Sequence, residues 1–184
     1  MTNKDLANVI FPNITKTIED YEKEYPKRDL GEGACVTRFA PSPTGFMHIG
    51  HFQAALIDYV IAKNSNGLFL LRNEDTDKAR ENKEAVDINM DILNEYEMHV
   101  DEYQYHDKIE GNYGPYIQSE RKEIYHTFIK HLIAEGKAYP CFLTQEEMDS
   151  IRESQTKDKR RIGIYGRFAK YRNLSPDEAA ERIN

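Results

Sequence analysis

The sequence has 184 residues, of which 39% are hydrophobic and 31% charged, and it includes 12 Tyr and 8 Phe. This composition excludes an intrinsically disordered chain, because it supplies enough apolar side chains for a buried core. The formal net charge of −7 excludes a globally basic protein, so any nucleic acid must be bound by a local basic patch.

The first 33 residues are polar and mixed, apart from one amphipathic stretch. This stretch runs from Asn3 to Tyr25 and is interrupted by Pro12, which breaks helices. We predict an N-terminal helical arm over residues 1–33. Gly31 and Gly33 then separate it from the rest of the chain.

A strand, helix, strand unit is predicted next. Residues 34–40 suit a short buried strand, and residues 68–71 form an apolar run typical of a parallel strand buried on both faces. Between them, apolar residues recur at helical spacing, as expected for a helix that covers one side of a sheet. These residues are Phe52, Ala55, Leu56, Tyr59 and Val60.

Two further helices are predicted, from about Glu81 to Tyr96 and from Ser119 to Gly136. The alternation of strands and helices indicates an α/β fold with a parallel sheet, in which ligands bind at the carboxyl ends of the strands. Sites should therefore lie after Phe39 and after Leu71. We place one domain at residues 34–137.

After residue 137 the sequence pattern changes from alternating strands and helices to capped helix starts. Thr144 with Glu147, and Ser175 with Glu178, each predict a capped helix start. Residues 138–184 are too few for a comfortable independent fold, so we expect them to be the start of a second domain. We expect the chain to be truncated at its C-terminus.

The two cysteines, Cys35 and Cys141, are far apart in sequence and lack the spacing of a metal site or a disulfide framework. We therefore expect two reduced cysteines. The N-terminus has no signal peptide pattern, and no apolar run approaches the roughly 18 residues of a membrane span. These features predict a cytoplasmic protein with no membrane partner.

The segment from Arg38 to His51 reads RFAPSPTGFMHIGH and connects the first predicted strand to the next helix. Pro41 and Pro43 favour an extended loop, and Gly45 permits a turn. The first backbone N–H groups of the helix can bind an anion at the sheet edge. This geometry suits a phosphate group.

His48 and His51 lie three residues apart, so both imidazoles project to one side of a helical first turn. There they can donate hydrogen bonds to a triphosphate. Gly50 removes a side chain where a flat ring could press on the backbone. The spacing by itself leaves open two exposed histidines without a function.

The whole stretch resembles the HIGH signature of class I aminoacyl-tRNA synthetases, and RFAPSPTG resembles the glutamyl branch of that family. The resemblance implies a Rossmann-like parallel sheet with flanking helices that binds ATP with Mg²⁺. It also implies that His48 and His51 stabilise the α-phosphate while the amino-acid carboxylate attacks. The residues it implies for ATP binding are Pro41, Ser42, Thr44, Gly45, His48, Gly50 and His51.

The segment RNEDTD, from Arg72 to Asp77, resembles the acidic box of the same family. By this resemblance Glu74 receives the α-ammonium of glutamate, while Arg38, Ala40 and Ser42 surround its side-chain carboxylate. Such pairing places opposite charges at the two ends of the substrate. For Asp75 and Asp77 we predict turn-forming roles in a solvated loop.

Two weaker resemblances concern the segment GPYIQSER and residues 138–184. GPYIQSER, from Gly114 to Arg121, is similar to a family segment whose role looks architectural, with Ser119 as a helix N-cap. Residues 138–184 resemble the start of an inserted domain that binds the tRNA acceptor end. The basic stretch from Lys157 to Arg161 predicts contacts of Lys159, Arg160 and Arg161 with acceptor-stem phosphates. Arg80 resembles a basic residue that follows the acidic box in relatives and approaches the tRNA 3′ end. A plain solvated surface is the open alternative for both.

The chain also departs from the family pattern. Relatives with a zinc site carry Cys-x-Cys where this chain has Cys141, Phe142 and Leu143, so we predict no zinc. His51 stands where the glutamyl group commonly has a small residue. The lysine-rich KMSKS loop and an anticodon-binding region are missing, so we expect an incomplete fragment with feeble activity.

The resemblance predicts a monomeric glutamate-tRNA ligase whose partners are L-glutamate, ATP and the tRNA acceptor end. Two alternatives stay open. One is a synthetase-like enzyme that glutamylates the queuosine base of tRNA(Asp), because it keeps similar motifs. The other is a non-catalytic paralogue that binds nucleotide or tRNA.

Overall fold

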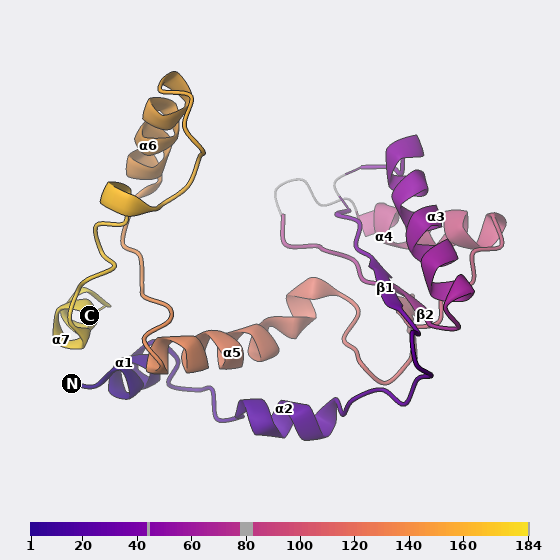
Figure 1. Ribbon diagram of the computed structural model, residues 1–184, viewed down its shortest axis with the longest axis horizontal. Coiled ribbons are helices and arrows are strands. Elements are labelled where there is room, and N and C mark those ends of the chain that lie inside the picture. The colour runs from indigo at the N-terminus through magenta and orange to yellow at the C-terminus, as the bar shows by residue number, and fades with distance from the viewer. Residues whose placement is uncertain (44, 78–82, 184) are drawn as a thin grey trace. The chain divides into compact units, whose positions relative to one another are not determined.

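The computed structural model (Figure 1) describes residues 1–43, 45–77 and 83–183. The chain is α/β, with a small parallel sheet and flanking helices. It divides into two compact units, and each is described by itself. Unit 2 comprises Glu19–Tyr125, and unit 1 comprises Met1–Ile18 together with His126–Asn184. The three consecutive domains expected from the sequence stay a prediction.

The sheet of unit 2 contains the predicted strand, helix, strand element. Strand β1 (Val36–Phe39) pairs in parallel with β2 (Leu68–Leu71), and helix α3 (Ile49–Asn64) connects them. The register sets Phe39 opposite Leu71. Both strands therefore end at the same edge, directly before the two sequence motifs.

Strand β2 continues into further pairing on its other side. The Leu71 N–H donates to the carbonyl of Glu102 at 3.0 Å, after helix α4 (Lys83–Glu95) has returned the chain. An antiparallel hairpin follows, made of β3 (Tyr103–Tyr105) and β4 (Lys108–Glu110). The sequence did not predict this hairpin, because its short strands are polar and fall below the length at which alternation is informative.

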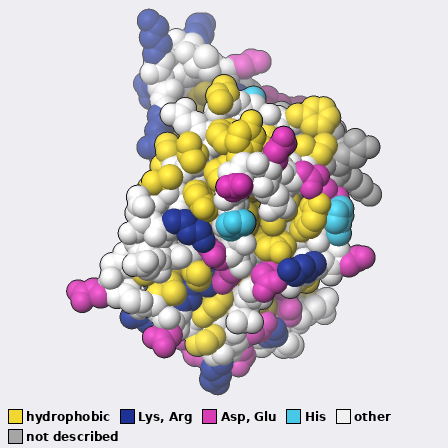
Figure 2. Space-filling view, turned by 90° about the vertical axis from the view of Figure 1, so that its right-hand side faces the viewer, with side chains coloured by type: hydrophobic (Ala, Val, Ile, Leu, Met, Phe, Trp, Pro, Cys, Tyr) yellow, Lys and Arg dark blue, Asp and Glu magenta, His cyan; other side chains and the backbone are white. Residues whose placement is uncertain are grey.

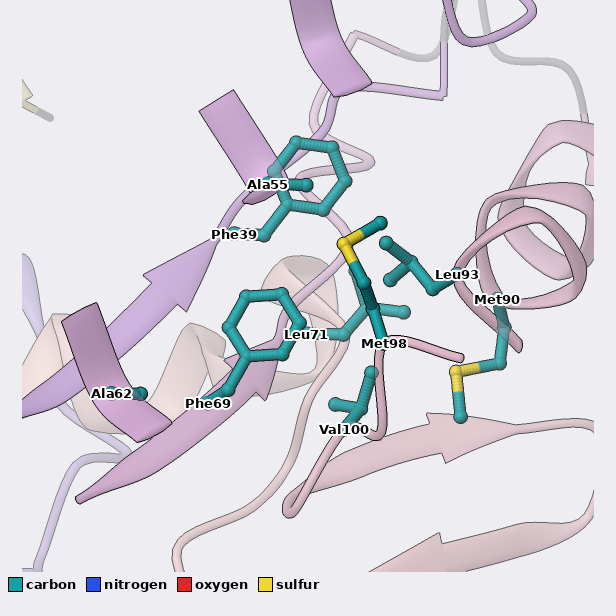
Figure 3. Close-up of a cluster of buried hydrophobic side chains, with 9 residues drawn as sticks. All are labelled: Phe39, Ala55, Ala62, Phe69, Leu71, Met90, Leu93, Met98 and Val100. Carbon is teal, nitrogen blue, oxygen red and sulfur yellow. The ribbon is translucent and has the colours of Figure 1, made fainter. Parts of the chain in front are cut away.

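The core of unit 2 lies between the sheet, α3 and α4 (Figure 3). Phe69 and Leu71 are buried, whereas Leu68 and Leu70 of the same strand are only half-buried. The prediction that this strand is buried on both faces was therefore wrong in part. The buried members of the core are Phe39, Ala55, Ala62, Phe69, Leu71, Met90, Leu93, Met98 and Val100.

Helix α3 buries only a narrow stripe. Ala55 is fully buried against the sheet, but Leu56 and Val60 are 41% and 43% exposed, contrary to the predicted stripe. Hydrophobic side chains gather on the side of the molecule where α3 and α4 lie (Figure 2). The exposed apolar residues of α3 are Ile49, Leu56, Ile57, Val60 and Ile61.

Unit 1 is helical. Its core joins α1 (Asn3–Ile10), α5 (Lys122–Ala134) and α7 (Pro176–Ile183) through five buried residues. These are Leu6, Ala7, Ile133, Ala179 and Ala180. The predicted arm forms two helices, α1 and then α2 (Ile18–Glu24), on either side of Pro12.

The capping predictions in unit 1 are confirmed. Helix α6 (Gln145–Lys157) begins with a capping box between Thr144 and Glu147, and Ser175 exchanges hydrogen bonds with Glu178 at the start of α7. The remaining short elements are the 3₁₀ turns η1 (Gln118–Arg121) and η2 (Gly166–Phe168). Across the described residues no helix is both long and apolar enough to cross a bilayer.

Candidate functional site

The carboxyl ends of β1 and β2 bring the proline loop and the acidic box into contact. Beyond the paired strands, the Arg72 N–H donates to the carbonyl of Phe39 at 3.1 Å, and the Glu74 N–H donates to the carbonyl of Pro41 at 2.9 Å. Two motifs that are more than thirty residues apart in the sequence thus meet by backbone hydrogen bonds. The two motifs expected to carry the site thus lie side by side at this edge, and their role in binding stays a prediction.

Three charged side chains of these motifs form one cluster. Glu74 Oε1 lies 3.7 Å from Arg38 Nη2 and 3.1 Å from Arg72 Nη2. The side chains of Arg38 and Glu74 are 44% and 31% exposed, whereas that of Arg72 is 17% exposed. Arg38 and Glu74 are therefore accessible to a ligand, and Arg72 supports Glu74 from the more buried side.

Sequence reasoning did not single out Arg72 or Asp58 at this site. Arg72 is the first residue of the acidic box, but the sequence analysis assigned it no role of its own. Asp58, on α3, is half-buried, and burial raises its pKa while the nearby Arg38 guanidinium partly offsets that rise. Its position near Arg38 depends on how α3 packs, for which the sequence carries no local signal.

The two histidines lie at the start of α3 and stack on each other. Their ring centroids are 3.8 Å apart, with 22° between the planes. His48 is the N-cap of α3, and its Nδ1 accepts a hydrogen bond from the Gly50 N–H at 3.1 Å. A Cβ at residue 50 would lie 3.0 Å from the His48 ring. Glycine thus leaves room for that ring, as predicted, and both imidazoles are exposed.

The cap hydrogen bond has a chemical consequence. Because Nδ1 of His48 acts as an acceptor, the neutral imidazole carries its proton on Nε2. That N–H is then available as a donor to an anion. The first turn of α3 adds its own unpaired backbone N–H groups, which favour a phosphate.

The other proposed ATP and glutamate residues line the loop between these two sites. Pro41 and Pro43 are buried, Ala40 is half-buried, and Ser42 and Gly45 are exposed. Thr44 lies outside the described residues. Across the described residues, no hydrogen bond, ion pair or ring contact joins the histidine pair to Arg38 or Glu74. Their convergence on a shared cleft stays a prediction.

The GPYIQSER segment pairs with the acidic box from the other side. The Asn73 N–H donates to the carbonyl of Tyr116 at 3.0 Å, and the Gln118 N–H donates to the carbonyl of Asn73 at 2.9 Å. All three motifs are thus in backbone contact. The architectural role that the resemblance suggested for this segment is consistent with its place.

Asp75 corrects one expectation. It is only 4% exposed, and its carboxylate accepts hydrogen bonds from the Ser119 N–H at 2.8 Å and the Ser119 hydroxyl at 2.5 Å. The prediction of a solvated turn residue was wrong for Asp75. Ser119 lies inside η1, whose N-cap is Ile117, so the predicted capping role of Ser119 was also wrong.

The basic stretch lies in unit 1, where α6 ends. Lys159, Arg160 and Arg161 are exposed, and Arg160 Nε lies 3.7 Å from Asp158 Oδ2. The fully buried Gln155 holds the loop that follows, because its amide both donates to and accepts from the backbone of Gly163, at 2.8 and 2.9 Å. The basic side chains thus stand on an anchored loop. Arg80 lies outside the described residues.

Residues 1–43, 45–77 and 83–183 contain no group of three or more His, Cys, Asp or Glu arranged to hold a metal ion. Cys35 and Cys141 are free and exposed. The absence of zinc stays a prediction.

Comparison with known proteins identifies what the chain is similar to. Residues 34–181 match the family described as tRNA synthetases class I (E and Q), catalytic domain. The glutamate-tRNA ligase of Clostridium perfringens (strain 13) is 52% identical over 184 residues, which are 100% of this chain and 34% of that protein. The glutamate-tRNA ligase of Acetivibrio thermocellus is 45% identical over the same length, again 34% of its own.

A solved structure is similar as well. The glutamate tRNA ligase of Elizabethkingia meningosepticum CCUG26117, crystallised in complex with its amino acid, superposes with a TM-score of 0.68 and 36% sequence identity. The match covers 83% of this chain and 30% of that one. The chain therefore spans about a third of the length of the curated relatives that it matches.

Proposed function

This chain belongs to the catalytic-domain family of the class I tRNA synthetases for glutamate and glutamine (E and Q), and we propose that it forms the amino-acid and ATP site of a glutamate-tRNA ligase. In the first step, glutamate and Mg²⁺-bound ATP give glutamyl adenylate and pyrophosphate. In the second step, the 3′-terminal ribose of tRNA takes the glutamyl group. The backbone contact between Glu74 and Pro41 carries the proposal, because it joins the two motifs into one site.

Glutamate would replace the weak contact between Arg38 and Glu74. That ion pair is partly exposed and 3.7 Å long, and such pairs contribute only about 0–1 kcal/mol. A glutamate molecule offers a carboxylate to Arg38 and an ammonium to Glu74, and each charge-assisted hydrogen bond is worth about 1.5–3 kcal/mol. Substrate thus exchanges one weak contact for two stronger ones. Ala40 and Ser42 complete the pocket for the side-chain carboxylate.

The histidine pair would bind the phosphates. Nε2 of His48 is free to donate, and His51 stacks beside it at the N-terminus of α3. Pro41, Ser42, Thr44, Gly45 and Gly50 shape the loop that receives ATP. Donors placed where charge develops on the α-phosphate stabilise the transition state more than the ground state. The chemistry needs positioning and charge stabilisation, with no covalent enzyme intermediate.

Magnesium would arrive bound to the triphosphate, which supplies its oxygen ligands. There it offsets negative charge on the phosphates. The protein residues hold the phosphate oxygens and orient the glutamate carboxylate toward the α-phosphate.

The tRNA contacts are the third part of the proposal. We propose that residues 138–184 begin an insertion that binds the acceptor end, with Lys159, Arg160 and Arg161 contacting its phosphates. Their exposure on an anchored loop supports this role. Arg80, which follows the acidic box, is proposed as a further contact near the tRNA 3′ end.

Isothermal titration of the 184-residue chain tests the proposal. We expect saturable binding of a non-hydrolysable glutamyl-adenylate analogue. The glutaminyl analogue should bind at least about tenfold more weakly, because Arg38 would lose its carboxylate partner. If circular dichroism shows a folded chain that binds neither this analogue nor ATP, the proposal is wrong and a non-catalytic paralogue is favoured.

A further inference from the structure

The segment before β1 is tied to the loop that precedes GPYIQSER. The Arg28 guanidinium forms a two-pronged ion pair with the Glu102 carboxylate, with Nη2 2.7 Å from Oε2 in one prong and Nη1 bonded to Oε1 in the other. The Tyr113 ring covers this guanidinium at 3.6 Å, and the Tyr113 hydroxyl donates to the carbonyl of Pro26 at 2.7 Å. Residues 26–28 are therefore fixed within unit 2 by contacts that the prediction of a helical arm did not include.

Glu102 is a buried carboxylate whose other partner is Tyr116. The residue is 5% exposed, and its Oε2 accepts a hydrogen bond from the Tyr116 hydroxyl at 2.9 Å. A Cβ at Gly111, where φ is +98°, would lie 2.5 Å from that hydroxyl. Burial raises the pKa of Tyr116 to about 12, so the hydroxyl stays a donor. The backbone at Gly111 is thus shaped around the Glu102 and Tyr116 pair.

The same pair holds the backbone that leads to Glu74. The carbonyl of Glu102 accepts from the Leu71 N–H at 3.0 Å, and the carbonyl of Tyr116 accepts from the Asn73 N–H at 3.0 Å. The side-chain hydrogen bond between Glu102 and Tyr116 thus links the two backbone hydrogen bonds, which lie on either side of Arg72. Glu74 follows directly.

We propose that Arg28 is a positioning residue for the amino-acid site. By neutralising the buried Glu102 carboxylate, it keeps Glu102 and Tyr116 in the arrangement that fixes the backbone presenting Glu74. This inference rests on the proposed function and gives the segment before β1 a part in it. Without Arg28, Glu102 would be a buried charge without its main partner, which is costly. It would then turn toward water, and the hold on Asn73 would weaken.

The test compares Arg28→Met with Lys63→Met in the 184-residue chain. Lys63 also contacts both carboxylate oxygens of its partner Asp101, at 2.9 Å each, and Asp101 accepts from the Phe69 N–H at 2.7 Å. This control removes an ion pair that also supports the backbone of β2, at Phe69, which is farther from Glu74 in the sequence. Calorimetry gives Kd for the glutamyl-adenylate analogue, and NMR hydrogen exchange follows the Asn73 and Glu74 amides.

We expect Arg28→Met to raise Kd by about tenfold or more, because small misplacements of a binding group are costly, and to speed exchange at Asn73 and Glu74. Lys63→Met should leave Kd within about twofold. Adding Glu102→Gln should restore binding to within about threefold, because a neutral amide still accepts from Tyr116.

The outcomes separate the two proposals. A folded chain without substitutions that binds no analogue overturns the proposed function. If that chain binds and Arg28→Met binds equally well, only the positioning role is overturned, even where exchange is faster. If Arg28→Met does not fold, Arg28→Lys and the double variant with Glu102→Gln replace it. Arg28→Lys keeps the positive charge, so its Kd should stay close to that of the chain without substitutions. A Kd in the double variant that stays about tenfold or more above that of the chain without substitutions then overturns the positioning role, because the double variant leaves no buried charge unpaired.

Discussion

The backbone N–H of Glu74 donates to the carbonyl of Pro41 at 2.9 Å, so a main-chain hydrogen bond joins the acidic box to the proline loop. Side-chain substitutions can therefore test the chemistry of the site without dismantling the edge that forms it. Because the strands end in register, the sheet brings the segments that carry Arg38 and Glu74 to the same edge.

Glu74→Gln should weaken binding of the glutamyl-adenylate analogue by about tenfold to a hundredfold. The amide keeps the size of the side chain but loses the charge that receives the α-ammonium, worth about 1.5–3 kcal/mol. Calorimetry measures the change, and Glu110→Gln on the exposed strand β4 is the control. Equal affinity in both variants would remove Glu74 from the amino-acid site.

The two functions of His48 can be separated by substitution. His48→Ala removes the N-cap of α3, which should lower the free energy of unfolding by about 0.5–2 kcal/mol, and it should also abolish detectable ATP binding. His48→Asn keeps a capping side chain, so it should retain most of the stability and still lose ATP. Urea denaturation and ATP titration distinguish these effects, and ATP binding that survives in His48→Asn would contradict a phosphate role for the imidazole.

Asp75 should matter for stability more than its place in an acidic loop suggests. Asp75→Ala leaves the Ser119 N–H without this partner, so the free energy of unfolding should fall by about 1–3 kcal/mol. Ser119→Ala removes the hydroxyl but keeps the N–H bond, and it should cost less. Urea unfolding compares the variants, and a neutral Asp75→Ala would show that the contact contributes nothing to stability.

The basic loop of unit 1 should make RNA binding depend on salt. Replacing Lys159, Arg160 and Arg161 by Ala should weaken binding of an acceptor-stem hairpin and flatten the plot of log K against log salt, because fewer counterions are released. Fluorescence anisotropy from about 50 to 200 mM salt measures the slope. Gln155→Ala keeps every charge but loosens the loop, and it should weaken binding less. An unaltered slope in the triple variant would rule out phosphate contacts.

Local patterns in the sequence predicted the elements that depend on nearby residues. A continuous apolar run predicted β2, and apolar residues at helical spacing predicted α3. The Thr144 and Glu147 pair predicted the start of α6. The positions of the motifs after the two strands followed from the geometry of parallel sheets. Contacts between distant residues could not be predicted in this way.

Two such contacts decide the surroundings of the site. Asp75 reaches Ser119 across 44 residues, and Arg28 reaches Glu102 across 74 residues. Nothing in the local sequence of Asp75 distinguishes a buried carboxylate from a solvated one, because its burial depends on a partner supplied by another motif. The hairpin of β3 and β4 was missed because its polar strands have no apolar period.

The capping carboxylate of Glu147 should make the stability of α6 depend on pH. The Lys170 ammonium and the Thr144 backbone N–H lower the pKa of Glu147 from its ordinary value of 4.5. Because the folded pKa lies below the unfolded one, the stabilisation is fully present above pH 4.5 and is lost as the pH falls through the folded value. The difference in thermal midpoint between the chain without substitutions and Glu147→Gln should therefore shrink toward pH 3. Glu153→Gln, on an exposed position of the same helix, is the control, and a difference for Glu147→Gln that stays constant from pH 7 to pH 3 would contradict a charged cap.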